Sequence, residues 1–253
     1  PILEEIIKSK LMTEPMEVNE RMRELSLKMP VGSTVLTVVR LVEQMALYYN
    51  QTKSIGTLKL NTPEEYVQQY VNEYYLMDMF YRRALEAYHE LVTLDIPIEA
   101  VINEAKRQLD QEYAKMANVM NLEWLTCVKE KGEAFRGVTL GRQQNFYRTE
   151  GDGTVKQVVI VSDALRYEVA VELMQQLAKE KHIATLTPYL AMLPTETKYC
   201  KPALLPHQSL ELQGTDMQVD GIVLASTEQR SAHLCKYKEG AICMRYEEVM
   251  NGD

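Results

Sequence analysis

Residues 158–168 read VVIVSDALRYE, and this stretch decides the fold class of the chain. Its four consecutive β-branched residues, Val158 to Val161, predict a strand buried on both faces, as in a parallel sheet. Asp163 would then stand at the carboxyl end of that strand, where open α/β sheets build their sites. The stretch therefore predicts an α/β fold with a functional carboxylate at one edge of the sheet.

A second polar loop, residues 193–197, reads LPTET and presents hydroxyl groups. Between the two loops, residues 166–179 predict a helix and residues 183–192 a second strand. A right-handed crossover in this β-α-β order places both strands in parallel and both loops at the same sheet edge. We therefore expect Asp163 and the loop near Thr197 to converge.

The chemistry of this pair depends on how the hydroxyl is activated. A threonine hydroxyl is a poor nucleophile at neutral pH and needs a neighbouring base or a metal. No histidine is placed to serve as the base, so the pattern favours a divalent cation held by Asp163, with the threonine oxygen in its shell. Two alternatives stay open: Asp163 only caps a helix that starts at Ala164, or it accepts a phosphoryl group as in receiver domains.

Composition limits the class of protein. The chain has 253 residues, a net charge of −8 and 36 acidic against 28 basic residues. This balance disfavours nonspecific binding to nucleic acid or membranes by the chain as a whole, although local basic patches remain compatible with it. No apolar run approaches the roughly 20 residues of a membrane span. These features predict a soluble protein with no membrane contact.

The cysteines and histidines do not predict a metal site of their own. The four cysteines form no C-x-x-C pair, which indicates reduced thiols in a cytoplasmic protein. His233 and Cys235 lie two residues apart, which does not match a zinc spacing, so we expect an ordinary helix surface there. The same interpretation applies to His207.

The first half of the chain is helical in pattern. Pro63 to about Thr93 predicts a long amphipathic helix, with Thr62 as N-cap and Glu65 at the capping-box position. Aromatic and aliphatic residues recur along one stripe of this helix, which indicates a core or partner-helix interface rather than a stacking platform for bases. The stripe comprises Tyr66, Tyr70, Tyr74, Met77, Tyr81, Leu85 and Tyr88.

Further helices complete this half. Residues 97–131 predict a second long helix that forms an antiparallel hairpin with the first. Ser33 or Thr34 would cap a third, after a short helix that ends near Pro30. Because residues 136–153 are rich in glycine, we expect a linker there. The predicted organisation is a helical module over residues 1–140 and an α/β domain over residues 141–253.

Three motifs together resemble the opening half of a PglZ domain, a branch of the alkaline phosphatase superfamily. They are residues 162–170, SDALRYEVA; residues 193–197, LPTET; and residues 203–207, ALLPH. The resemblance covers roughly residues 143–253 and depends most on the first motif. It implies the first half of an alkaline-phosphatase-like α/β/α sandwich with a mainly parallel sheet.

The resemblance also implies a chemistry. PglZ-like and related enzymes are expected to use a two-metal site, usually with zinc, and to hydrolyse phosphate esters by in-line displacement on a metal-bound Thr or Ser. Asp163 matches the first metal-binding Asp, and Thr197 matches the nucleophile, with Thr195 as the second choice. Glu196 departs from the commoner neutral residue, and we expect its carboxylate to point to solvent.

The family completes its metal shells with Asp and His residues well downstream of the nucleophile. The chain contains no Asp-His pair, so we expect the remaining ligands to lie beyond Asp253. By itself the chain should neither hold two metals firmly nor turn over substrate. The leading hypothesis for the complete protein is a metal-dependent phosphatase or phosphodiesterase that acts on a nucleic acid or nucleotide.

PglZ-type proteins resemble parts of bacteriophage exclusion (BREX) systems. The resemblance implies a cytoplasmic protein that works beside methyltransferase and ATPase components. A non-catalytic scaffold of such a complex is the alternative, in which the helical module recruits partners.

Overall fold

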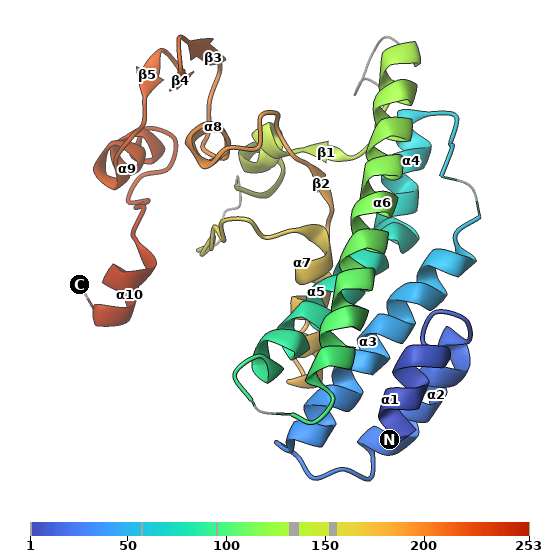
Figure 1. The fold of residues 1–253 in the computed structure, drawn as a ribbon. Helices are drawn as coiled ribbons and strands as arrows, with labels where there is room; N and C mark the ends of the chain where they lie inside the picture. The colour runs from blue at the N-terminus through green and yellow to red at the C-terminus, as the bar shows by residue number, and fades with distance from the viewer. Residues whose placement is uncertain (1, 57, 95, 132–136, 152–155, 253) are drawn as a thin grey trace. The chain divides into compact units, whose positions relative to one another are not determined.

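The computed structural model describes residues 2–56, 58–94, 96–131, 137–151 and 156–252, which form two compact units (Figure 1). The helical unit comprises residues 1–138 and 166–184. The C-terminal unit comprises residues 139–165 and 185–253. The chain therefore leaves the C-terminal unit once, after Leu165, and returns to it at Thr185.

The helical unit is built around α3 and α5, which pack against each other, while α2 lies on α3 and α6 contacts α1, α4 and α5. In Figure 1, α6 runs as one long helix along this unit. The elements are α1 (Ile2–Ser9), α2 (Pro15–Ser26), α3 (Thr34–Ser54), α4 (Pro63–Gln69), the π-helical turn η1 (Tyr70–Tyr74), α5 (Tyr75–Leu91), α6 (Glu99–Lys131) and α7 (Tyr167–Lys179).

The predicted helix starts are confirmed. Ser33 caps α3, because its hydroxyl accepts a hydrogen bond from the Leu36 N–H at 3.2 Å. Thr62 caps α4 in the same way and accepts from the Glu65 N–H at 3.2 Å, with Pro63 in the first turn. The Glu65 carboxylate accepts from the Asn61 N–H at 2.9 Å, one residue before the expected partner.

The stripe on α4, η1 and α5 belongs to the core, as predicted. Tyr74 and Met77 are buried in it, and Tyr81 packs against it while its ring stacks on Tyr113 of α6 with 3.8 Å between centroids. Burial raises the pKa of Tyr81 to about 12, and a hydrogen bond to Asp110 adds to this shift. Rings used in this way stabilise the helix hairpin and leave no exposed stacking platform.

The C-terminal unit is made of short elements (Figure 1). Strands β3, β4 and β5 form an antiparallel sheet in that order, and β1 pairs with β2 in parallel. The elements are β1 (Gly141–Arg142), the 3-10 turn η2 (Gln143–Asn145), the π-helical turn η3 (Tyr147–Gly151), β2 (Tyr189–Leu190), α8 (Thr197–Ala203), β3 (Leu210–Gln213), β4 (Asp216–Val219), β5 (Ile222–Val223), α9 (Thr227–Cys235) and α10 (Tyr246–Asn251).

The predicted buried strand at Val158–Val161 is wrong for this structure. These four residues form no strand, and their side chains are 50% to 85% exposed. A strand needs a neighbour for its backbone hydrogen bonds, and within the described residues no strand pairs with this segment. The four β-branched residues therefore remain outside regular secondary structure and exposed.

The predicted strand at residues 183–192 is reduced to β2. Tyr189 lies opposite Gly141 rather than opposite the segment at 158–161. Gly141 is suited to this pairing, because a Cβ at its position would lie 2.8 Å from Cε1 of Tyr189. The expected sandwich with a mainly parallel sheet is thus not seen, and the described sheets comprise one parallel pair and one antiparallel meander.

Helix α7 was predicted over residues 166–179 and is confirmed over Tyr167–Lys179. It packs in the helical unit, where the Tyr167 ring meets the edge of Tyr75 with 5.3 Å between centroids. The Glu168 carboxylate is fully buried, 2.5 Å from Nη2 of Arg166 and 3.5 Å from Nε of Arg82. The Arg-Tyr-Glu part of the first motif therefore anchors α7.

Other expectations concern loops, thiols and membranes. The expected linker at 136–153 contains β1, η2 and η3 over residues 141–151, while residues 132–136 and 152–155 lie outside the described part. None of the four cysteines forms a disulfide within the part of the chain that the structure describes. Of the helices that the structure describes, none combines the length and the hydropathy needed to cross a bilayer.

Candidate functional site

Asp163 and Thr197 meet in the C-terminal unit. The Thr197 hydroxyl donates a hydrogen bond to Oδ2 of Asp163 at 2.9 Å and lies 3.2 Å from Oδ1. Both side chains are exposed. The convergence expected from the sequence is present, although the loop before α7 and the start of α8 produce it rather than the edge of a parallel sheet.

The backbone after Asp163 has an unusual conformation. Ala164 has a φ of 55°, in the left-handed region, and its N–H donates to Oδ1 of Asp163 at 3.0 Å. A left-handed non-glycine residue costs about 1 kcal/mol, and such residues cluster at functional sites. Helix α7 starts at Tyr167, so Asp163 does not cap it and that alternative is wrong.

Thr197 is the first residue of α8, and Glu196 precedes it at the N-cap position. Of the two threonines in the loop, Thr197 is the one whose hydroxyl bonds Asp163 within the described part of the chain. The exposed Glu196 carboxylate lies 3.4 Å from Nζ of Lys198. Its negative charge is therefore partly balanced beside the threonine.

Cys200 lies about one helical turn after Thr197 on α8 but is unsuited to act as a nucleophile. Its thiol donates to the Pro194 carbonyl at 3.5 Å. Burial raises the pKa of the Cys200 thiol, and the negative charge of Asp163 raises it further. Since the thiolate is the reactive form, the hydroxyl of Thr197 is the better candidate.

A hollow of about 370 Å³ opens beside Thr197 in the C-terminal unit. Lys198 and Lys201 of α8 line it together with Arg230 of α9 and Asp216 of β4. These basic residues were not among the candidates that the sequence analysis identified. The spacing of Thr197 and Lys201, four residues apart on one helix face, was the available signal.

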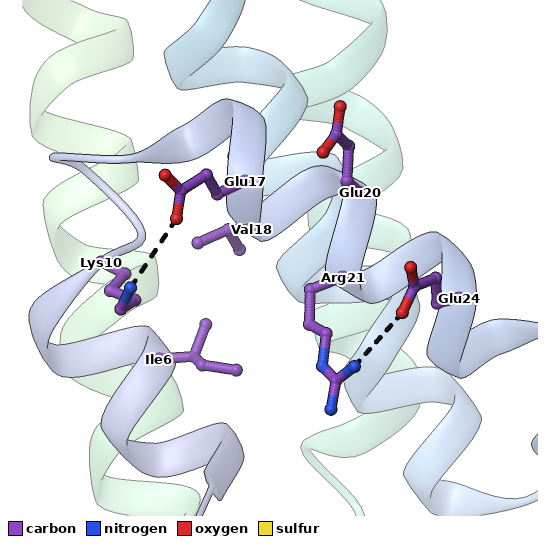
Figure 2. Close-up of a pocket in the computed structure, with 7 residues that line it drawn as sticks. All are labelled: Ile6, Lys10, Glu17, Val18, Glu20, Arg21 and Glu24. Atoms are coloured by element: carbon purple, nitrogen blue, oxygen red, sulfur yellow. Dashed lines mark hydrogen bonds and ion pairs between the residues drawn. The ribbon is translucent and has the colours of Figure 1, made fainter.

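A larger hollow, of about 450 Å³, lies between α1 and α2 of the helical unit. Figure 2 shows Lys10 directed at Glu17 and Arg21 directed at Glu24, with N to O distances of 3.7 and 3.2 Å. Its charges are thus largely paired on the surface, and no hydroxyl or thiol lines it. This hollow carries no catalytic constellation.

The metal that the family resemblance implies can be tested against the donors present. Asp163 and Thr197 offer oxygen atoms, which suit a divalent cation. However, among the described residues no three His, Cys, Asp or Glu side chains gather in one place. The pair therefore fits a cation in donor type but supplies only part of a shell.

Two of the histidines contact backbone carbonyl oxygens instead. His233 lies on α9 and is buried rather than on the helix surface as expected, with Nε2 2.7 Å from the Pro206 carbonyl oxygen. Nδ1 of His207 lies 2.7 Å from the Leu205 carbonyl oxygen. Neither ring is directed at the Asp163 and Thr197 pair by these contacts.

Comparisons with known proteins relate the C-terminal half of the chain to a described family. Residues 144–252 match the family described as the BREX system PglZ alkaline phosphatase-like domain. The expected resemblance to a PglZ domain is thereby confirmed for this segment, which contains both Asp163 and Thr197. No solved structure matches the chain.

Two curated relatives extend this result. The chain is 26% identical over 194 residues to the alkaline phosphatase-like protein PglZ of Bacillus cereus (strain H3081.97), across 74% of the chain and 22% of that protein. It is 40% identical over 111 residues to the alkaline phosphatase-like protein BrxZ of Escherichia coli O9:H4 (strain HS), across 40% of the chain and 13% of that protein. The matches thus span about a fifth or less of each relative.

Proposed function

We propose that this chain supplies the nucleophile, Thr197, and one cation ligand, Asp163, of a PglZ-type phosphoester hydrolase that acts in phage defence. The observation that carries the proposal is the 2.9 Å hydrogen bond between these two side chains, inside the segment that matches the PglZ domain. Neither residue is needed for the core, since both are exposed. A role in catalysis therefore explains their pairing better than a role in packing.

In the proposed reaction, Asp163 orients the Thr197 hydroxyl by accepting its hydrogen bond. The Thr197 hydroxyl releases its proton to solvent as its oxygen attacks phosphorus in line, the bond from phosphorus to the ester oxygen breaks, and the leaving alkoxide takes up a proton from solvent. Water then hydrolyses the phosphothreonine and restores the hydroxyl. A divalent cation held by Asp163 would supply charge neutralisation and a lower pKa for the hydroxyl.

We further propose two zinc ions as the cations of the complete protein. A closed two-metal shell takes more donors than one carboxylate and one hydroxyl. The proposal therefore requires Asp or His donors from other parts of the protein. The chain by itself is expected to bind such ions weakly and to turn over little substrate.

The proposed setting is a BREX system in the cytoplasm, with methyltransferase and ATPase components as partners. It is supported by the family that residues 144–252 match and by the two relatives named PglZ and BrxZ. The proposed substrate is a phosphodiester of a nucleic acid or nucleotide.

The test compares the variants Thr197→Ala and Thr195→Ala, each made in the natural full-length protein. With bis(p-nitrophenyl) phosphate and zinc, Thr197→Ala should lower kcat by about a thousandfold or more, because it removes the nucleophile. Thr195→Ala should stay within a factor of about three. Both variants should show the parent's circular dichroism and melting temperature.

The opposite pattern would move the nucleophile to Thr195. A parent protein without activity toward any phosphodiester would favour the alternative of a non-catalytic scaffold.

A further inference from the structure

The hollow beside Thr197 is basic, although the chain as a whole is acidic. Three of its lining side chains are cations, Lys198, Lys201 and Arg230, against one carboxylate, that of Asp216. The whole chain carries a net charge of −8. A local excess of positive charge in a concave surface raises the local concentration of anions.

Arg230 is held in a fixed orientation at the wall of this hollow. Its Nε donates to the Leu224 carbonyl at 3.1 Å, and its Nη2 donates to the Ala225 carbonyl at 2.7 Å. The start of α9 is fixed by a capping box between Ser226 and Gln229. A guanidinium oriented in advance loses little entropy when it binds an oxyanion, and these two bonds do not use its Nη1 group, which can donate to phosphate oxygens.

Lys201 is the least committed cation in the hollow. It is half-buried on α8, and it has no ion-pair partner within the residues that the structure describes. Lys198 is more engaged, since its Nζ lies 3.4 Å from Glu196 and 4.6 Å from the centroid of the Tyr199 ring. Lys201 and Arg230 are therefore the two side chains best able to bind an anion.

We infer that this hollow binds a second phosphate group of the substrate, next to the one that Thr197 attacks. The inference rests on the proposed function and extends it, because it identifies the substrate as one that carries adjacent phosphates. A volume of about 370 Å³ exceeds what one phosphate group needs and lies in the range of small-ligand pockets. It admits a phosphate with an attached sugar.

Two sources supply adjacent phosphates, a nucleic-acid strand and a nucleoside polyphosphate. Both place a second oxyanion a few bonds from the scissile phosphorus. A simple ester with a single phosphate would leave Lys201 and Arg230 without an anion to bind. The hollow therefore selects for phosphate-rich substrates through two cations that do not take part in bond breaking.

Binding can be measured without turnover. We would titrate the chain, in EDTA, into fluorescein-labelled oligothymidylate and follow anisotropy, with unlabelled oligothymidylate or thymidine triphosphate as competitor. Lys201→Gln and Arg230→Gln should each weaken binding about tenfold, as expected for loss of one charge-assisted contact. The salt dependence should fall by about 0.7 in log K per log salt.

Lys236→Gln is the matched control. Lys236 is exposed at the end of α9 and does not line the hollow, so its variant should bind within a factor of about two of the parent. Arg230→Gln also removes two bonds to backbone carbonyls and could unfold α9. If α9 unfolds in Arg230→Gln, the binding of Lys201→Gln alone tests the inference.

Three results would overturn the inference: no binding by the parent chain, unchanged binding in Lys201→Gln, or an equal loss in Lys236→Gln. Competition by unlabelled oligothymidylate but not by the triphosphate would support the site and identify a strand as the source, and competition by both would support it with a nucleotide as a second source. If Thr197 proves dispensable for turnover while Lys201→Gln still weakens binding, the proposed function fails and the phosphate site stands.

Discussion

The hydroxyl of Thr197 donates to Oδ2 of Asp163 at 2.9 Å, and the two residues lie 34 positions apart in the sequence. The same carboxylate accepts the Ala164 N–H through Oδ1. Oδ1 of Asp163 is thus oriented by the next backbone N–H, and Oδ2 accepts the hydrogen bond from the Thr197 hydroxyl. This arrangement keeps the hydroxyl and the carboxylate together before any substrate or cation binds.

Asp163→Asn should weaken zinc binding to the chain by about tenfold or more, because loss of even an outer-shell partner costs 10 to 100-fold. The amide oxygen can still accept from Thr197, and the site is exposed, so the free energy of unfolding should change by less than about 0.5 kcal/mol. Calorimetric zinc titration with Glu211→Gln as control checks this. Equal affinity in parent and Asp163→Asn would remove Asp163 as a ligand.

Arg82→Met should destabilise the helical unit by about 3 kcal/mol, since it leaves the fully buried Glu168 with less compensation. Neither carboxylate oxygen of Glu168 has a well-directed hydrogen-bond donor among the described residues. The ion pairs with Arg82 and Arg166 therefore stabilise its charge. Urea unfolding measures the cost.

The exposed pair of Arg107 with Glu104 on α6 provides the control for this measurement. Arg107→Met should cost less than about 0.5 kcal/mol. A cost for Arg82→Met no larger than that of Arg107→Met would contradict the role assigned to Glu168.

The stability of the helical unit should fall in acid partly through Glu172. Burial raises the pKa of Glu172, but hydrogen bonds and charge from Arg82 and Arg83 outweigh this effect and hold the pKa below its usual 4.5. A lowered folded pKa adds stability that is complete above pH 4.5 and is lost as pH falls through the folded value. The parent should therefore exceed Glu172→Gln in stability by about 1 kcal/mol at pH 7.

This difference should shrink as pH falls below 4.5. Urea melts from pH 7 to pH 3 on both proteins measure it, with the exposed Glu20→Gln as control. A constant difference over the whole range would show that the carboxylate charge of Glu172 does not matter.

Ile160→Thr should change the free energy of unfolding by less than about 0.5 kcal/mol, because Ile160 is 85% exposed. It should also reduce self-association, since an exposed run of β-branched residues is prone to pair with other chains. Val171→Thr, at a position that is 5% exposed on α7, should cost about 1 to 3 kcal/mol. Similar costs at both positions would mean that Ile160 is buried in solution.

The fold predicted for the second half of the chain was only partly right, because that half is held together by contacts between residues far apart in the sequence. The run at 158–161 predicted a strand, but a strand exists only where another backbone accepts its hydrogen bonds. The motifs at residues 162–170, 193–197 and 203–207 predicted the PglZ resemblance correctly. It did not indicate that Glu168, five residues later, would be buried against Arg82 in the helical unit.

The sequence by itself determined the features whose partners lie within a turn or two of the chain. Ser33 and Thr62 cap helices through bonds to residues three positions away, and the 3.6-residue period predicted the buried stripe from Tyr66 to Tyr88. The single long helix predicted there is interrupted by the π-helical turn η1, which the period did not indicate. Only the tertiary structure decided which charges share a space. Lys201 and Arg230 line one hollow because α8, β4 and α9 fold around it, and spacing along the chain carries no information on such distant neighbours.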